Sequence, residues 1–257
     1  MSLDPLPKPK STLAKGKINS EYEDFLLGDA IGGVPFSHWT AHLRFFWGWY
    51  SEEPDFNCAE GDLSHLQQAI SEELHTAGYP DLAREISAAG SAAAINTTIF
   101  AQYTNETSLY GEVNAALRQA HTGASLRGHP LSAWMLQFNS ALRLRSDFDG
   151  PAYRGVYMTS NDIDQYQLGL MFEWAAFVSA SKYRDTALDY RGSVLFDITP
   201  GGSYSMYAKR NPFDIAEHST FPGEQEVVFP IACTYRVTNI RKDGRRSLIS
   251  LETVDQY

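Results

Sequence analysis

The chain has 257 residues, 43% of them hydrophobic and 13% aromatic, so it is long enough to bury a substantial globular core. Its formal net charge of −10 argues against nucleic acid or an anionic membrane as a partner, because both attract an excess of Lys and Arg. No apolar run reaches the length of a membrane span, and the N-terminus has no hydrophobic signal core. We therefore expect a chain that does not span a membrane. We also expect a monomer.

Residues 1–19 are rich in Pro and Lys and poor in bulky apolar residues, which predicts a flexible leader. From residue 20 to 147, apolar residues recur at three- and four-residue spacing, which predicts a mainly helical lobe. The expected helices span residues 21–27, 62–77, 81–94, 110–120 and 132–145. We interpret the aromatic-rich residues 36–50 as core packing rather than as a ligand site.

The cysteines and histidines, which often hold metals or form bridges, show no metal-site pattern. Cys58 and Cys233 are too few for a disulfide scaffold and lack the spacing of a zinc site, and both a single bridge and two buried thiols stay open. His38 and His42 lie four residues apart but lack an intervening Glu and a third ligand. We expect no metal.

After the turn residues at 147–151, short β-branched and aromatic runs alternate with turn residues, which predicts strands. These runs span residues 152–158, 173–179, 193–198, 226–232, 234–240 and 247–253. Helices followed by strands predict an α+β protein in which residues 20–257 form one domain, with a helical lobe at 20–147 and a β-rich core at 148–257. The long segment 199–221 between two strands is expected to be a functional or mobile loop.

Residues 221–230 have the pattern of a Pro-Gly turn that enters a strand. Side chains at i and i+2 of a strand share a face, so Glu224 and Glu226 are expected side by side, with Gln225 on the other face. Two acids this close cannot both ionise freely, so one should titrate high while the other stays anionic. A solvated charged edge would also explain the pair, and residues 21–23 repeat the pattern without evident purpose.

Two further motifs precede the acid pair on other expected strands. Arg154 and Gly155 lie near the start of one strand, and Ser179 ends another. The spacings are 25 residues from Arg154 to Ser179 and 47 residues from Ser179 to Glu226. The order of these motifs on successive strands carries more information than any one of them.

With these motifs, the chain resembles the arginine-specific mono-ADP-ribosyltransferases of the Arg-Ser-Glu class, which includes vertebrate ecto-enzymes and bacterial toxins and effectors. Residues 100–104, 109–118 and 224–238 also resemble stretches of the ecto-enzyme branch. The resemblance implies an N-terminal helical lobe packed on a split β-sandwich that binds NAD between its sheets. It also implies secreted or extracellular residence, although the ecto-enzymes have more cysteines.

The resemblance implies that the enzyme transfers ADP-ribose from NAD to an exposed arginine of a protein substrate. Arg154 would clamp the diphosphate of NAD through paired hydrogen bonds, and Gly155 would let the backbone approach the nicotinamide amide. Ser179 would orient Glu226. Glu226 would bind the ribose 2′-hydroxyl and stabilise an oxocarbenium-like transition state.

Glu224 would orient the incoming guanidinium and help to remove its proton, and it favours arginine because relatives that modify asparagine or cysteine have Gln there. Tyr190 lies eleven residues after Ser179, where many relatives place Phe against the nicotinamide ring, with core packing as the alternative. Phe221 would contact the protein substrate, or else it only anchors its turn. Ser181 is expected to make structural hydrogen bonds.

Two other functions stay open. Water could replace the acceptor, which would make the protein an NAD glycohydrolase, or the chain could be a non-catalytic NAD-binding module. The four polar residues Arg154, Ser179, Glu224 and Glu226 argue against the module, because a retired site has no physical need for a pair of neighbouring acids.

Overall fold

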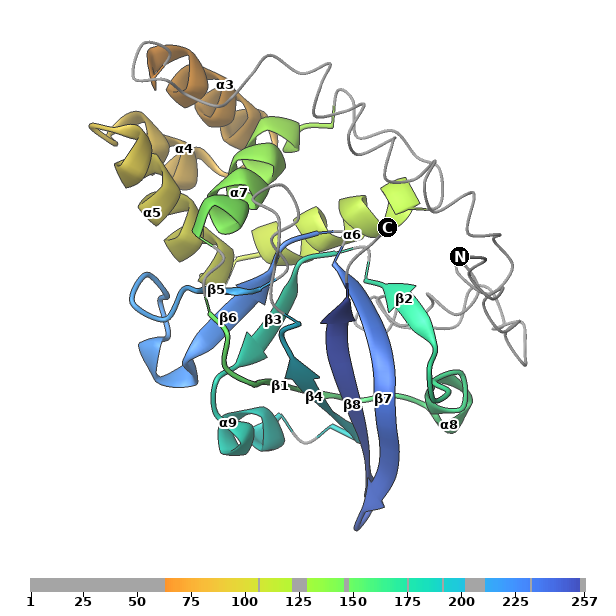
Figure 1. Ribbon diagram of the computed structural model, residues 1–257. Helices are drawn as coiled ribbons and strands as arrows, with labels where there is room; N and C mark the ends of the chain where they lie inside the picture. Colours follow the sequence, from red (N-terminus) through yellow and green to blue (C-terminus); the bar gives the residue numbers. More distant parts are fainter. Residues whose placement is uncertain are drawn as a thin grey trace, which may run out of the picture.

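The computed structural model describes residues 63–105, 107–121, 129–145, 148–174, 176–190, 192–201, 211–231 and 233–254. Helices of the first half gather above a sheet (Figure 1). They are α3 Leu63–Thr76, α4 Pro80–Ser87, α5 Ala92–Thr104, α6 Leu109–His121 and α7 Ser132–Arg145. The expected leader and helix 21–27, the aromatic stretch 36–50, His38, His42 and Cys58 lie outside the described residues, and Cys233 is buried.

The second half of the described chain forms a hydrogen-bonded sheet with the strand order β2-β7-β8-β4-β1-β3-β6-β5. The strands are β1 Ala152–Val156, β2 Met171–Glu173, β3 Val178–Ser181, β4 Val194–Thr199, β5 Phe213–Asp214, β6 Glu226–Phe229, β7 Thr234–Asp243 and β8 Arg246–Val254. β1 and β3 are joined by a single register pair, Tyr153 with Ser181, so the sheet divides there into two parts. The predicted α+β class with a split sheet is confirmed.

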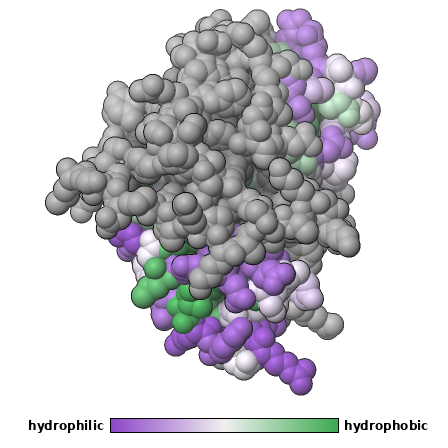
Figure 2. Space-filling model, turned by 90° about the vertical axis from the view of Figure 1, so that its right-hand side faces the viewer, coloured by the Kyte–Doolittle hydropathy of each residue, from purple (hydrophilic) through white to green (hydrophobic). Residues whose placement is uncertain are grey.

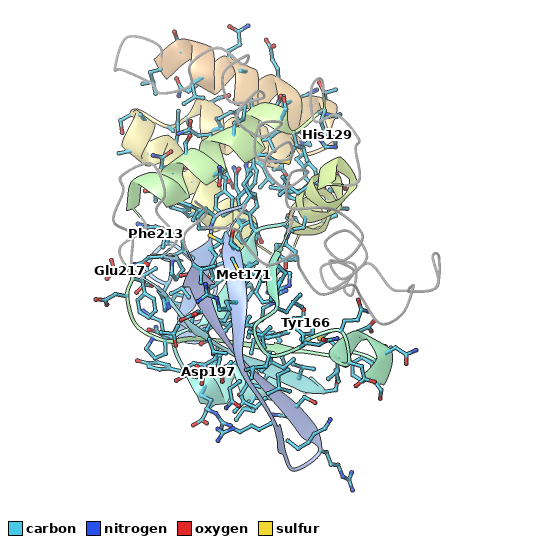
Figure 3. The ribbon with its side chains drawn as sticks, turned by 45° about the vertical axis from the view of Figure 1, so that its right-hand side comes forward. His129, Tyr166, Met171, Asp197, Phe213 and Glu217 are labelled. Atoms are coloured by element: carbon cyan, nitrogen blue, oxygen red, sulfur yellow. The ribbon has the colours of Figure 1, made fainter. Side chains whose placement is uncertain are left out.

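Two buried clusters flank the smaller part of the sheet, β3-β6-β5. On β6, Val228 packs in the cluster of the helices, whereas Val227 and Phe229 pack in a second cluster with residues of β4, β7 and β8. This alternation follows from the two-residue period of a strand. Phe213 and Tyr166, labelled in Figure 3, belong to the first and the second cluster respectively. The smaller part therefore lies between the helices and the rest of the sheet.

The prediction of one helix over residues 81–94 is wrong. α4 ends at Ser87 and α5 begins at Ala92, because the Ser91 side chain caps α5 by accepting a hydrogen bond from the Ala94 N–H at 3.1 Å. α5 then continues to Thr104, well past the expected end. The predicted helices over 62–77, 110–120 and 132–145 are confirmed to within two residues as α3, α6 and α7.

The prediction of one strand over residues 173–179 is also wrong. β2 ends at Glu173 and pairs with β7, whereas β3 begins at Val178 and pairs with β6 at the other end of the sheet. The side chains of Trp174, Ala176 and Phe177 between them are all buried. A continuous apolar run without alternation gives no sign of where one strand stops and the next begins.

The remaining predicted strands are present with small shifts of their ends. β1 and β6 are shorter than expected, while β7 and β8 are longer and form a hairpin whose turn contains Gly244 at φ +62°. The helices α8 Ser160–Ile163 and α9 Arg184–Asp189 and the 3₁₀ turn η3 Pro222–Glu224 were not predicted. The expected loop 199–221 contains the short strand β5, and its residues 202–210 lie outside the description.

Buried side-chain hydrogen bonds fix the position of α5 among the helices. The Gln102 side chain donates to the Leu82 carbonyl of α4 at 3.0 Å and accepts from the Trp134 indole of α7 at 3.1 Å. Gln102 is 1% exposed, so losing either partner would leave a buried polar group without its bond. The C-terminal end of α5, which points at the sheet, is thereby held at a fixed place.

On the face shown in Figure 2, hydrophilic residues predominate among those coloured, and hydrophobic ones gather in a small area. The most exposed large hydrophobic side chain among those described is Leu168, at 74%. In the described ranges, every helix falls short of the length and apolar character that a bilayer crossing requires.

Candidate functional site

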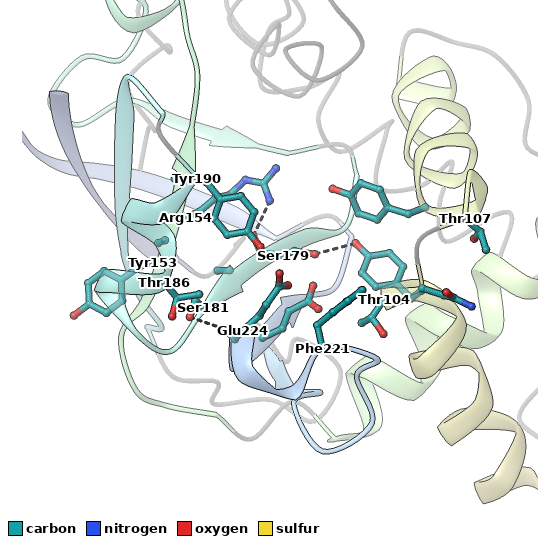
Figure 4. A pocket seen from close by; sticks show the side chains of 17 residues that line it. Thr104, Thr107, Tyr153, Arg154, Ser179, Ser181, Thr186, Tyr190, Phe221 and Glu224 are labelled. Atoms are coloured by element: carbon teal, nitrogen blue, oxygen red, sulfur yellow. Dashed lines mark hydrogen bonds between the residues drawn. The ribbon is translucent and has the colours of Figure 1, made fainter. Parts of the chain in front are cut away.

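A cavity of ≈ 410 Å³ opens between the C-terminal end of α5, the split between β1 and β3, α9 and the turn before β6 (Figure 4). Its lining includes every site residue predicted from the sequence: Arg154, Gly155, Ser179, Tyr190, Phe221, Glu224 and Glu226. These residues come from four separate segments of the chain. The structure therefore brings together the groups that the sequence placed far apart.

Arg154 lies in the middle of β1, and its Nη1 donates to the Ser179 carbonyl of β3 at 2.6 Å. This hydrogen bond crosses the split in the sheet, where β1 and β3 share a single register pair. A guanidinium holds its five donors in one rigid plane, so this contact also fixes the direction of the other N–H groups. Arg154 thus presents a fixed positive charge on the cavity wall.

Gly155 lines the cavity but also has a packing role that the sequence did not reveal. A Cβ atom at this position would lie 1.9 Å from the backbone oxygen of Ala187 in α9. A similar contact exists at Gly192, where a Cβ would lie 2.2 Å from the Val156 oxygen. The two glycines therefore let β1 and the segment of α9 approach closely enough to bring Tyr190 to the cavity.

We expect Gly155→Ala to lower the free energy of unfolding by about 1–3 kcal/mol, because backbone atoms must move to admit the methyl group. Chemical denaturation of the purified protein measures the difference. The matched control is Gly111→Ala in α6, where a Cβ would meet nothing within 4 Å and helix propensity favours Ala. Equal stability of Gly155→Ala and the wild type would contradict the packing role.

Ser179 and Glu226 share one face of the β3-β6 pair. Ser179 is in register with Val228, and Glu226 precedes Val228 by two residues, so both side chains point to the face that the helices cover. Burial raises the pKa of the Glu226 carboxyl to about 7, and the charge of Glu224 acts in the same direction. A hydrogen bond from Ser179 and the charge of Arg154 oppose this rise in pKa. One acid of the pair thus has a raised pKa, as expected, but burial and not the neighbouring charge is the main cause.

Glu224 is not on the strand with Glu226, and this part of the prediction is wrong. It ends the 3₁₀ turn η3, and Gln225 after it takes a left-handed conformation at φ +51° before β6 begins. The turn is held by β3, because the Ser181 hydroxyl donates to the Glu224 carbonyl at 2.8 Å and the Lys182 N–H donates to the Gln225 carbonyl at 2.9 Å. Both acids still line the same cavity, and the structural role expected of Ser181 is confirmed.

Tyr190 and Phe221 lie at the mouth of the cavity, with 58% and 38% of their surfaces exposed. This exposure excludes core packing as the role of Tyr190. Partial burial raises the pKa of the Tyr190 hydroxyl, and a hydrogen bond with Glu224 raises it further. The phenol therefore stays protonated, and its O–H can donate a hydrogen bond to the Glu224 carboxylate.

Part of the lining was not predicted. Tyr103 and Thr104 at the end of α5 and Tyr110 in α6 form the wall on the helical side. Tyr103 is 2% exposed, and its hydroxyl lies 3.3 Å from the Ser179 hydroxyl. The signal in the sequence was the resemblance of residues 100–104 and 109–118 to relatives, which carried no role for a particular residue.

The described residues contain no cluster of three or more His, Cys, Asp or Glu side chains that could hold a metal ion. The charged groups of the cavity are instead one guanidinium and two carboxylates. Such a set can bind an anion at one end and face a developing or permanent cation at the other.

Comparisons with known proteins agree with this geometry. The sequence profile of the family described as NAD:arginine ADP-ribosyltransferase matches residues 90–257. A comparison with curated protein sequences finds no match. ADP-ribosyltransferase HopU1 of Pseudomonas syringae pv. Tomato DC3000 is similar in structure, with a TM-score of 0.54 at 19% identity over 83% of this chain and 97% of that chain.

Two other solved structures are similar to the same extent. ADP-ribosyltransferase Vis from Vibrio splendidus, in complex with agmatine, has a TM-score of 0.52 at 19% identity over 79% of this chain and 89% of its own. Exoenzyme S from Pseudomonas aeruginosa, in complex with human 14-3-3 protein beta and bound to carba-NAD, has a TM-score of 0.54 at 16% identity, over 75% and 88%. At these identities the likeness establishes the fold.

Proposed function

The chain belongs to the NAD:arginine ADP-ribosyltransferase family, and from this premise we propose that it transfers ADP-ribose from NAD to an arginine side chain of a target protein, releasing nicotinamide. One observation carries the proposal: a single cavity gathers a guanidinium, a serine hydroxyl and two carboxylates from separate segments. This is the set of groups that the two halves of the reaction require.

Arg154 binds the diphosphate of NAD, because its planar guanidinium can donate paired, charge-assisted hydrogen bonds to phosphate oxygens. The nicotinamide lies beside Gly155, with the ring of Tyr190 against it. Support comes from the position of these residues at the split in the sheet, where Arg154 is already oriented by the Ser179 carbonyl. The cavity of ≈ 410 Å³ is of the size that proteins use for small organic ligands.

The bond between C1 of the ribose and the nicotinamide nitrogen breaks, and its electron pair leaves with nicotinamide. Positive charge then develops on C1 and the ring oxygen, as in glycoside cleavage. Glu226 accepts a hydrogen bond from the 2′-hydroxyl and stabilises this cation electrostatically. Ser179 supports it by donating a hydrogen bond to the Glu226 carboxylate, an interaction that lowers the pKa of that group.

The acceptor is a guanidinium, whose nitrogen attacks C1 and must lose a proton. Glu224 binds this cation and takes the proton. Its support is that Glu224 lines the same cavity as the exposed side chains of Phe221 and Tyr190. The complex of the similar Vis enzyme with agmatine, a guanidine, supports this choice of acceptor. A protein as the natural substrate is in line with the complex of Exoenzyme S with 14-3-3 protein beta.

The pH dependence of NAD cleavage should follow Glu226. We expect kcat/KM for NAD to fall on the acid side of a pKa near 7, because the carboxylate is needed in its charged form and burial raises its pKa to about 7. The charge of Glu224 contributes to that rise, so Glu224→Gln should move the acid limb to lower pH. An acid limb unchanged by this substitution would contradict the coupling of the two carboxylates.

The proposal is tested by incubating the purified protein with NAD and agmatine and measuring nicotinamide and ADP-ribosyl-agmatine by liquid chromatography and mass spectrometry. We expect both products, no transfer to putrescine, which lacks the guanidine, and a loss of roughly 100-fold or more in Glu226→Gln. Absence of nicotinamide above the Glu226→Gln level would refute the activity. Nicotinamide release without transfer would identify an NAD glycohydrolase instead.

A further inference from the structure

The last turn of α5 contacts both halves of the candidate site through two consecutive residues. Tyr103 reaches Ser179 on β3, and Thr104 reaches Thr220, which lies just before the turn that carries Phe221 and Glu224. These contacts join residues 76 and 116 positions apart in the chain. The function proposed above assigns no role to either residue.

The direction of the first contact follows from counting protons. Ser179 has one hydroxyl proton, and its interaction with the Glu226 carboxylate, which lowers the pKa of that group, uses this proton if the carboxylate is charged. With that proton engaged, the Ser179 oxygen can accept from the Tyr103 hydroxyl, which lies 3.3 Å away, and this is the direction that the proposal uses. Burial raises the pKa of the Tyr103 hydroxyl well above its usual value, so the phenol stays protonated and can donate a hydrogen bond.

The ring of Tyr103 is fixed by its neighbours. It packs against Phe138 at a centroid distance of 4.4 Å, Tyr110 at 5.2 Å and Phe177 at 6.0 Å. Since the ring cannot turn without displacing these side chains, its hydroxyl has one accessible position. The Ser179 hydroxyl is therefore held from the side of α5 by the contact drawn as a dashed line in Figure 4, and Glu226 lies on its other side.

The second contact is a short hydrogen-bonded link on the acceptor side. The Thr104 hydroxyl accepts from the Thr220 N–H at 2.9 Å and donates to the Ala101 carbonyl at 3.0 Å. The Thr220 backbone leads directly into the segment in which the Phe221 carbonyl accepts from the Glu224 N–H at 3.0 Å. Thr104 thus fixes the start of the turn that brings Glu224 into the cavity.

We propose that Tyr103 and Thr104 are positioning residues for the two halves of the reaction: Tyr103 orients Glu226 through Ser179, and Thr104 orients Glu224 through Thr220. The inference rests on the function proposed above. It predicts that two adjacent substitutions have separable effects, one on cleavage of NAD and the other on use of the acceptor.

For Tyr103 the diagnostic reading is the titration of Glu226. The groups that face this carboxyl are Ser179 on β3, Arg154 on β1, Glu224 in η3, Tyr190 after α9 and Tyr103 on α5. Tyr103→Phe keeps the ring and removes one hydroxyl. Without its donor, Ser179 is free to rotate, its bond to the carboxylate weakens, and the pKa of Glu226 rises.

The first experiment compares the wild type with Tyr103→Phe in nicotinamide release across pH. We expect kcat to fall about 3- to 10-fold, the value of one net hydrogen bond, with KM for NAD within about twofold and the acid limb moved to higher pH. Tyr235→Phe is the matched control, because Tyr235 is equally buried but lies in the second cluster, away from the cavity. An unmoved acid limb in Tyr103→Phe, or the same shift in Tyr235→Phe, overturns the role of Tyr103.

The second experiment measures transfer to agmatine by Thr104→Val, which removes the hydroxyl at nearly constant shape, and by Thr104→Ser, which retains it. We expect Thr104→Val to raise KM for agmatine about 3- to 10-fold with the acid limb of NAD cleavage unchanged, and Thr104→Ser to restore the wild-type value within about twofold. Equal KM values in all three proteins overturn the role of Thr104.

A third measurement does not depend on activity. The pKa of Glu226 is followed by carbon NMR of protein labelled at the glutamate side-chain carboxyls, with the signal assigned by its loss in Glu226→Gln. A higher pKa in Tyr103→Phe than in the wild type supports the inference even if the wild type releases no nicotinamide, in which case only the proposed function fails. An equal pKa overturns the role of Tyr103 whatever the activity.

Discussion

Glu226→Gln is expected to unfold with a free energy about 3 kcal/mol higher than the wild type at pH 8.5, with the difference vanishing near pH 4. Burial raises the pKa of Glu226 from 4.5 in the unfolded chain to about 7 in the folded protein. Between these values the folded state binds more protons than the unfolded state, so this group makes stability fall as pH rises. Above pH 7 the full cost of a buried carboxylate is present, and glutamine removes it.

Urea denaturation of both proteins at pH 4, 6 and 8.5 measures this difference. The exposed Glu217, labelled in Figure 3, provides the control, because Glu217→Gln removes the same charge from the surface and should change stability by less than about 0.5 kcal/mol. A gap between Glu226→Gln and the wild type that does not widen with pH would mean that the carboxylate is better solvated than its burial indicates. The charged carboxylate that cleavage of NAD requires would then cost the folded protein little stability.

The sequence predicted elements well where one periodicity ran between clear stop signals. α7 was predicted over the residues that it occupies, 132–145, and β8 over nearly all of its length. Prediction from the sequence failed where the same pattern continued from one element into the next. The boundary between α4 and α5 depends on a single cap at Ser91, and the gap between β2 and β3 is as apolar as the strands beside it.

The candidate site was predicted from motifs, and its local geometry was not. Glu224 and Glu226 reach one cavity, but a 3₁₀ turn and the left-handed Gln225 bring them there instead of a continuous strand. An alternating pattern of side chains gives no sign of a turn. Here the turn depends on one residue, Gln225, in the left-handed backbone region. The two-residue spacing of the acids correctly indicated that both reach one site, although they do so through a turn and not as neighbours on a strand.

Tyr103 shows the limit of reasoning from sequence alone. A tyrosine on the apolar face of a helix looks like an ordinary core residue, and its ring is indeed packed among aromatic side chains. The contact that matters joins its hydroxyl to Ser179, which lies 76 residues further along the chain. No local pattern encodes the meeting of two hydroxyls at the boundary of helices and sheet.

Substitutions of the two cavity carboxylates should affect different halves of the reaction, with Glu226 needed for cleavage of NAD and Glu224 for transfer to the acceptor. Glu224→Gln is expected to lower the rate of transfer to agmatine by roughly 100-fold or more, because the incoming guanidinium loses both its counter-charge and its proton acceptor. NAD hydrolysis without an acceptor should stay within about threefold of the wild type, since Glu226, Ser179 and Arg154 still act on NAD. Parallel measurement of nicotinamide and ADP-ribosyl-agmatine separates the two rates.

Glu217→Gln is the matched control for this split, because it makes the same change in net charge at a residue outside the cavity lining. It should leave both rates near those of the wild type, whereas a loss of long-range attraction for the cationic acceptor would affect both Glu variants alike and weaken with salt. If Glu224→Gln lost NAD hydrolysis as well as transfer, Glu224 would act on the ribose together with Glu226. The choice of arginine as acceptor would then need another residue, and the exposed Tyr190, which donates to Glu224, would be the first to examine.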